Sequence, residues 1–310
     1  MLKTRMLVWA LVAAMGALLA GCAAPSAGRI AYEYHPNDQV SDIYIIQPDG
    51  KNAKPIIQNQ AWNGTPALSP DGTRIAFASD RDGNAELYVM NVDGTGLKRL
   101  TDNPGPDMFP AWSPDGKRIV FCSERMYKSP LKNDMMEVVT GMSVYFIDPD
   151  GSNLQRLGIP DPGLAAYPSW SPDGKRVAYM TVTDRQRIWV CDVSTDPVEP
   201  ADLTPYNYNE ELQPWTPRWA GGGRYIVFMG QTADRRDIYR MDADGKNLVN
   251  LTPGWAGLCA DPAVSPDGQH IVFASDKGGP VNLFVMDING RNATQITFER
   301  TMITRPSWSR

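Results

Sequence analysis

The sequence has few residues that could support histidine or cysteine chemistry. It contains two histidines, His35 and His270, in 310 residues. Such a small number nearly excludes a histidine-ligated metal centre or a histidine-based catalytic site. A Gly-x-Ser-x-Gly segment is also missing, so the chain lacks the nucleophile elbow of the α/β-hydrolases. These absences make a binding role a stronger hypothesis than hydrolysis by such a centre.

Cysteines are equally sparse, with four in the chain. Cys122, Cys191 and Cys259 each fall inside a predicted strand, and at least one of these three must be unpaired, which excludes a disulfide scaffold. Cys122 and Cys191 belong to neighbouring repeats and could form a bridge. Buried free thiols are the commoner state of cysteine in apolar strands, and we expect that state here.

The chain has one long apolar run, from Met6 to Ala20, after a start that contains Lys3 and Arg5. A basic start, an apolar run of this length and small residues after it predict a secretory signal peptide over residues 1–21. A membrane-spanning helix needs about 20 apolar residues, so anchoring by the peptide itself is the weaker interpretation. Without Lys3 and Arg5, the formal charge changes from −5 to −7. An acidic chain does not attract phosphate backbones, and we expect no nucleic-acid partner.

Leu19-Ala20-Gly21-Cys22 resembles a bacterial lipobox. The resemblance implies diacylglyceryl attachment to Cys22 and a lipidated tether over residues 22–28. An ordinary signal peptide followed by an incidental cysteine is the alternative. Ala23 rather than aspartate follows the cysteine, which by the same resemblance favours the outer membrane, facing the periplasm, if the cell has one, and the cell surface otherwise.

The rest of the chain repeats one sequence motif. Trp112-Ser-Pro-Asp-Gly-Lys-Arg-Ile-Val-Phe121 returns at residues 69–77, 170–179 and 265–273, and a degenerate copy fills 219–228. Proline, aspartate and glycine in this order form a tight turn between two strands. Asp71 and Asp115 are 44 residues apart, and Asp173 and Asp267 are 94 apart, or two repeats of 47. Four strands per repeat at this period predict an all-β, six-bladed β-propeller over residues 29–310.

The repeats also resemble the TolB-like β-propeller family, which carries the same Trp-Ser-Pro-Asp-Gly-Lys turn and a second turn such as Tyr88-Val-Met-Asn-Val-Asp93-Gly94. The resemblance covers almost everything after residue 28 and implies envelope proteins or cell-wall components as partners. It leaves no stretch for the N-terminal α/β domain that the periplasmic Tol-system member of this family carries. Propellers host unrelated activities, so the resemblance is specific for the fold and weak for the function.

The first repeat lacks its innermost strand, and the chain ends on a strand that matches it. Residues 29–34 match the strand that follows the Ser-Pro-Asp-Gly turn in the other repeats, but no such turn precedes them. Residues 303–309 match the strand that precedes this turn, but no turn follows them. We therefore expect the C-terminal strand to complete blade one and close the ring, which removes an open sheet edge. The tryptophans at this repeat position are expected to pack between blades: Trp112, Trp170, Trp219 and Trp308.

Each innermost strand carries a proline at the same position, which suits an edge strand that faces a central channel. The residues just before these prolines are candidate channel-facing residues: Thr65, Phe109, Tyr167, Thr216, Asp261 and Arg305. Two are aromatic, and Asp261 and Arg305 could form an ion pair. This mixed set suits recognition better than proton transfer. No cofactor or metal is expected, because the Asp-x-Asp-Gly turns lack the further ligands of a calcium loop.

Two variable loops complete the candidate partner-binding surface, on the face opposite the Ser-Pro-Asp-Gly turns. Residues 124–142 contain Met126, Tyr127, Met135 and Met136, and residues 205–216 contain Tyr206, Tyr208 and Trp215. Methionines and tyrosines form adaptable binding surfaces. A locally packed insertion is the alternative. We expect a monomeric, lipid-anchored binding scaffold; the alternative is a carbohydrate-active or peptide-processing enzyme with its site at the channel mouth.

Overall fold

The computed structural model describes residues 28–37, 39–130, 136–139, 141–159, 164–182, 185–195, 198–204 and 212–310. The predicted signal peptide, Cys22 and most of the tether lie outside these residues. So do three of the predicted partner-binding residues, Met135, Tyr206 and Tyr208. Of the segments 127–130 and 136–139 only the backbone is described.

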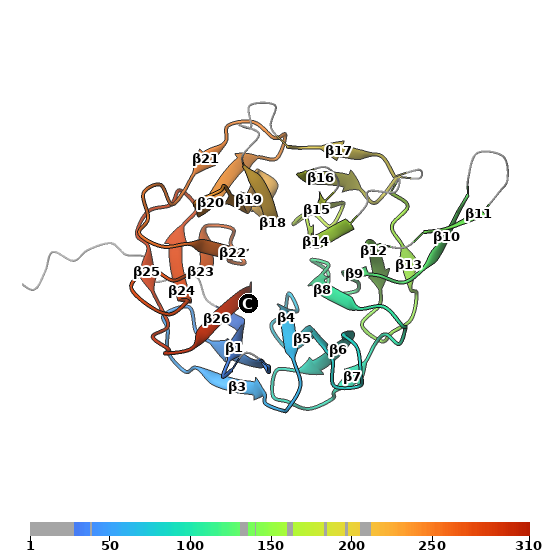
Figure 1. The fold of residues 1–310 in the computed structure, drawn as a ribbon, viewed down its shortest axis with the longest axis horizontal. Coiled ribbons are helices and arrows are strands. Elements are labelled where there is room, and N and C mark those ends of the chain that lie inside the picture. The colour runs from blue at the N-terminus through green and yellow to red at the C-terminus, as the bar shows by residue number, and fades with distance from the viewer. Residues whose placement is uncertain are drawn as a thin grey trace, which may run out of the picture.

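Six four-stranded antiparallel sheets form a ring (Figure 1). The predicted six-bladed propeller is confirmed. From the innermost strand outward, the first three blades are β26 (Met302–Ser309), β1 (Arg29–His35), β2 (Asp42–Ile46) and β3 (Lys54–Ile57); β4 (Asn63–Leu68), β5 (Arg74–Ser79), β6 (Glu86–Asn91) and β7 (Lys98–Arg99); and β8 (Asp107–Trp112), β9 (Ile119–Ser123), β12 (Ser143–Ile147) and β13 (Gln155–Arg156). The other three are β14 (Leu164–Trp170), β15 (Arg176–Val182), β16 (Gln186–Asp192) and β17 (Pro200–Asp202); β18 (Gln213–Ala220), β19 (Tyr225–Gln231), β20 (Arg236–Asp242) and β21 (Val249–Asn250); and β22 (Cys259–Val264), β23 (His270–Ser275), β24 (Asn282–Asp287) and β25 (Thr294–Gln295).

Two short elements lie outside this pattern. Strands β10 (Tyr127–Pro130) and β11 (Met136–Val139) pair as a separate hairpin inserted between β9 and β12. It extends outward from the ring (Figure 1). The 3-10 turn η1 (Gly221–Gly223) replaces the Ser-Pro-Asp-Gly turn in the degenerate repeat.

The last strand closes the ring as predicted. In Figure 1 the red strand β26 lies beside the blue strand β1. Their register places Ile30 opposite Trp308 and Glu33 opposite Thr304. Blade one is therefore built from both ends of the propeller, and its inner edge is covered by the C-terminal strand.

The hydrophobic core is divided among the interfaces between blades. Each of six clusters of buried residues joins two neighbouring blades. The central strands contribute to both of their faces, and Ile75, Ala76 and Phe77 are all fully buried. The tryptophans pack between blades as predicted: Trp112 is buried and its Nε1 donates a hydrogen bond to the Ala67 carbonyl of the preceding blade (2.9 Å).

The Ser-Pro-Asp-Gly turns are held by their own hydrogen bonds. In the first, Ser69 Oγ donates to Asp71 Oδ1 (2.6 Å) and accepts from the Arg74 amide (2.9 Å). Gly72 has a φ of 69°, a left-handed conformation that favours glycine. The hydrogen bonds from the Ser69 hydroxyl and the Thr73 amide lower the pKa of Asp71 to about 2. These contacts give the turn aspartate a structural role.

The closure of blade one centres on the Glu33 carboxylate. Glu33, on β1, is 0% exposed and contacts both blade two and the C-terminal strand. It accepts from the Thr65 amide of blade two (2.5 Å) and from Arg305 Nη1 of β26 (3.1 and 3.2 Å). His35 Nε2 lies 3.3 Å away. Burial alone would raise the pKa of Glu33, but Arg305, His35 and the Thr65 amide together hold it below its ordinary value.

Deletion of residues 302–310 should abolish the closed ring, because β1 would lose its inner neighbour and expose an unpaired edge. We expect loss of the single cooperative unfolding transition and aggregation during size-exclusion chromatography. Thermal unfolding followed by circular dichroism provides the measurement. A truncated protein that stays monomeric with an unchanged midpoint would contradict this role for β26.

Glu33→Gln should destabilise the protein by about 2–3 kcal/mol at pH 7, because it leaves Arg305 without its carboxylate partner. The pKa of Glu33 is lower in the folded state than in the unfolded chain. Its stabilisation is therefore fully present above the unfolded pKa and is lost as the pH falls through the folded pKa. Urea titrations should show a difference between wild type and variant that is large at pH 7 and shrinks in acid. The exposed Glu299→Gln is the matched control, and a similar loss there would contradict the assignment.

Candidate functional site

A repeated irregularity in the innermost strands forms the channel wall. In every blade, the pairing between the innermost strand and its neighbour skips two residues, and the second of these is proline. The residue before each proline has a positive φ, between 48° and 59°: Thr65, Phe109, Tyr167, Thr216, Asp261 and Arg305. Proline has no backbone N–H and cannot donate a hydrogen bond to the neighbouring strand, so the β-bulge at this position costs no such bond. The bulge turns six side chains out of the ladders at one level of the channel.

The left-handed conformation is strained at all six positions, because none of these residues is glycine. It is least favourable for the β-branched Thr65 and Thr216. Strain of this kind costs about 1–3 kcal/mol per residue and is found preferentially at functional sites. The ring therefore holds six strained residues around one small space.

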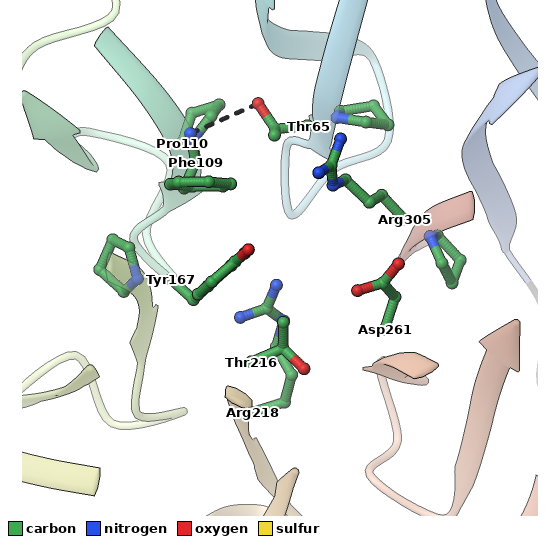
Figure 2. A pocket seen from close by; sticks show the side chains of 11 residues that line it. Thr65, Phe109, Pro110, Tyr167, Thr216, Arg218, Asp261 and Arg305 are labelled. Atoms are coloured by element: carbon green, nitrogen blue, oxygen red, sulfur yellow. Dashed lines mark hydrogen bonds between the residues drawn. The ribbon is translucent and has the colours of Figure 1, made fainter. Parts of the chain in front are cut away.

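This space is a cavity of about 40 Å³ (Figure 2). All six predicted channel residues line it, together with Pro66, Pro110, Pro168, Pro306 and Arg218. The channel-facing part of the prediction is confirmed, whereas binding of a partner by these residues stays a prediction. Arg218 was missed. It follows the proline at a position where the other five repeats have alanine or serine, and this departure from the repeat is the signal that could have identified it.

One side of the cavity is aromatic. The rings of Phe109 and Tyr167 lie 4.2 Å apart between centroids, and Trp215 contacts Tyr167 edge-on at 6.4 Å. Burial raises the pKa of the Tyr167 phenol, so it stays protonated as a hydrogen-bond donor. In Figure 2 its hydroxyl points into the same central space as the Arg218 guanidinium.

The other side of the cavity is charged. Asp261 and Arg305 could have formed an ion pair, but they do not approach within 4.0 Å, and Arg305 instead pairs with Glu33 at 3.1 Å. Glu33 lies behind Arg305 on β1 and offers a closer partner that the sequence did not reveal. Burial raises the pKa of Asp261 although Arg305 opposes it, and burial lowers the pKa of Arg218 although Asp261 opposes it.

The remaining predicted binding residues do not share this cavity. Met126 is 68% exposed and precedes the outward hairpin that contains Tyr127 and Met136. Trp215 lies next to Tyr167, at the start of an inner strand. The structure thus brings the six residues before the prolines together around the cavity. The described part of the loop 124–142 lies outside the cavity, at the outer side of the ring.

Other chemistry is limited in the described part of the chain. No three histidine, cysteine, aspartate or glutamate side chains there lie close enough to hold a metal ion. Cys122 and Cys191 are free and buried in one cluster between blades three and four, so the unbridged state is confirmed. Burial raises the pKa of the Cys191 thiol to about 12. None of the described helices is long and apolar enough to cross a membrane.

Comparisons with known proteins agree with this architecture. A family model described as TolB beta propeller domain matches residues 10–141 and 131–310. "Tol-Pal system protein TolB" of Francisella tularensis subsp. tularensis (strain WY96-3418) is 29% identical over 84 residues, which are 26% of this chain and 19% of that protein. The matched part is thus about a fifth of that relative's length.

Solved structures resemble the whole ring at low sequence identity. TolB from Acinetobacter baumannii gives a TM-score of 0.72 at 21% identity, covering 91% of this chain and 66% of that one. Hydrazine synthase from Kuenenia stuttgartiensis gives 0.71 at 15% identity, covering 92% and 46%. These likenesses show the fold alone. The family model, in contrast, matches most of the chain, and the chain therefore belongs to the TolB β-propeller domain family.

Proposed function

We propose that the protein is an exported, lipid-anchored propeller that serves as a binding scaffold in the bacterial envelope, with an envelope protein or a cell-wall component as its partner. The single observation that carries this orientation is the position of Gly28. It packs against the Ser309 carbonyl, and with Asp71, Gly72 and Arg310 it lines a surface depression beside the first Ser-Pro-Asp-Gly turn. A tether attached there leaves from the face that carries these turns.

The lipobox-like Leu19-Ala20-Gly21-Cys22 then sets the anchor close to that face. Residues 23–28 span at most about 20 Å, so the turn-rich face would lie near the bilayer. The connection from β9 to β12, which includes Met126 and the β10–β11 hairpin, leaves from the opposite end of its strands. Variable loops on a rigid scaffold commonly carry binding functions, and these loops would face away from the membrane. The Tol-Pal name of the relatives supports an envelope setting.

An enzyme acting in the channel mouth is the second candidate, and one observation favours it. Ionisable groups with shifted pKa values converge in the cavity, which is common at functional sites. Hydrolysis of a glycosidic bond commonly uses two carboxylates. Only Asp261 lines the cavity as a carboxylate, because Glu33 is held by Arg305 behind it. The channel therefore supports ligand binding better than glycoside hydrolysis.

Cys22→Ala should abolish lipid attachment, because it removes the thiol that would be acylated. We expect loss of metabolic labelling by a fatty-acid analogue and release of the protein from the membrane fraction. Ala23→Ser is the control and should stay labelled and membrane-bound. Unchanged membrane association of the alanine variant would contradict lipid anchoring.

A photo-crosslinking residue at Met126 or Tyr208 should capture the partner in cells, because both positions belong to the variable loops. The same residue at the exposed Lys117, on the turn-rich face, is the control and should capture little. Mass spectrometry of the crosslinked bands identifies the partner. Crosslinks that arise only from Lys117 would reverse the assignment of the binding face.

A further inference from the structure

The channel contains two opposite charges, Arg218 and Asp261, that form no direct ion pair. No ion pair within 4.0 Å joins Arg218 or Asp261 to any other residue in the described ranges. Among the described residues, the Arg218 guanidinium has one hydrogen bond, from Nη1 to the carbonyl of its own neighbour Pro217 (3.0 Å). Arg305, which also lines the cavity, is by contrast paired with Glu33 at 3.1 Å. Arg218 and Asp261 thus line the cavity without a direct ion pair, although each charge shifts the pKa of the other and the Arg305 backbone amide also acts on the Asp261 carboxylate.

The fold does not require an arginine at position 218. The same position is Ala67, Ala111, Ser169, Ala263 or Ser307 in the other five repeats, and all six blades adopt the same bulge. A guanidinium held in a narrow channel without a direct ion pair loses hydration and destabilises the free protein. A costly side chain that the backbone does not need is expected where a ligand supplies its partner.

Thr216 adds a second unsatisfied group at the same place. Its side chain is 3% exposed and lines the cavity, and its Oγ1 has no hydrogen-bond partner among the described residues. Buried hydroxyl groups are nearly always hydrogen-bonded, and an exception calls for an explanation. Tyr167 directs its hydroxyl into the same space (Figure 2). The Thr216 hydroxyl is itself inaccessible, so Arg218 and Tyr167 are the donors that reach the cavity and Asp261 is the acceptor.

The size of the channel limits the ligand. The cavity of about 40 Å³ has room for about three water molecules, or for a group the size of glycine. Arg218 also lines a wider space of about 210 Å³, which is bounded by Trp112, Trp170, Trp219 and Trp308 and leads toward the Ser-Pro-Asp-Gly turns. A ligand can therefore reach Arg218 from that side, and a small side chain can extend into the wider space.

The geometry points to a binding site for a small zwitterion, an α-amino acid, whose carboxylate is bound by Arg218 and Tyr167 and whose ammonium group is bound by Asp261. A simple anion would meet Arg218 but would also face the Asp261 carboxylate. A simple cation would face Arg218. A zwitterion gives each charge its partner and leaves the net charge of the channel unchanged.

Isothermal titration of the full-length protein with glycine and L-alanine, at constant ionic strength, tests this site. We expect saturable binding, with acetate and methylammonium binding at least tenfold more weakly. Arg218→Gln and Asp261→Asn should each weaken glycine binding at least tenfold. The exposed Arg236→Gln and Asp234→Asn remove the same charges outside the channel and should bind as wild type. The proposal is overturned if glycine does not bind, or if acetate binds equally well and Asp261→Asn has no effect.

Thermal unfolding without ligand separates binding from a structural role. Arg218→Gln should keep or raise the melting temperature, since it removes a buried charge that forms no direct ion pair, whereas loss of a structural arginine would lower the melting temperature. Tyr167→Phe removes only the hydroxyl and should weaken glycine binding without lowering the melting temperature. A lower melting temperature for Arg218→Gln together with wild-type glycine binding would refute the site. Crosslinking from the outer loops does not depend on this result, so the two proposals fail separately.

Discussion

The buried carboxylate of Glu33 is the contact on which the geometry of this propeller depends. A ring of six blades has one place where the chain must meet itself, and Glu33 lies there, bonded to Arg305 of the last strand and to the Thr65 amide of the second blade. One side chain thereby fixes three strands that are remote in sequence. The six interblade clusters supply most of the apolar burial, but they act together only in a closed ring.

Closure also determines what the channel can do. Arg305 forms its ion pair with Glu33, and Asp261 and Arg218 line the cavity without a direct ion pair. The strained residues before the prolines stay in place because each is fixed between a strand ladder and a neighbouring blade. Rigid positioning of this kind suits a small binding site, in which side chains are held ready for a ligand.

Much of this architecture can be predicted from the sequence, because it repeats. The period gives the blade number, the unmatched strands at the two ends give the closure, and the proline position gives the channel wall. The left-handed conformation at Thr65 and its equivalents could not be predicted, since a residue before proline ordinarily prefers an extended conformation. Glu33 and Arg218 were missed because their roles depend on contacts between distant strands. Of these two residues, Arg218 could have been identified from the sequence, because it is a large charged residue at a position where the other repeats have alanine or serine.

Hydrogen exchange of the backbone amides tests the central claim, that the two ends of the chain form one blade and close one cooperative ring. The account predicts that residues 302–309 are protected as strongly as the central strand of a blade made from continuous chain, such as β15 (Arg176–Val182), and that protection of both is lost at the same denaturant concentration. Rapid exchange in residues 302–309 while β15 stays protected would contradict it.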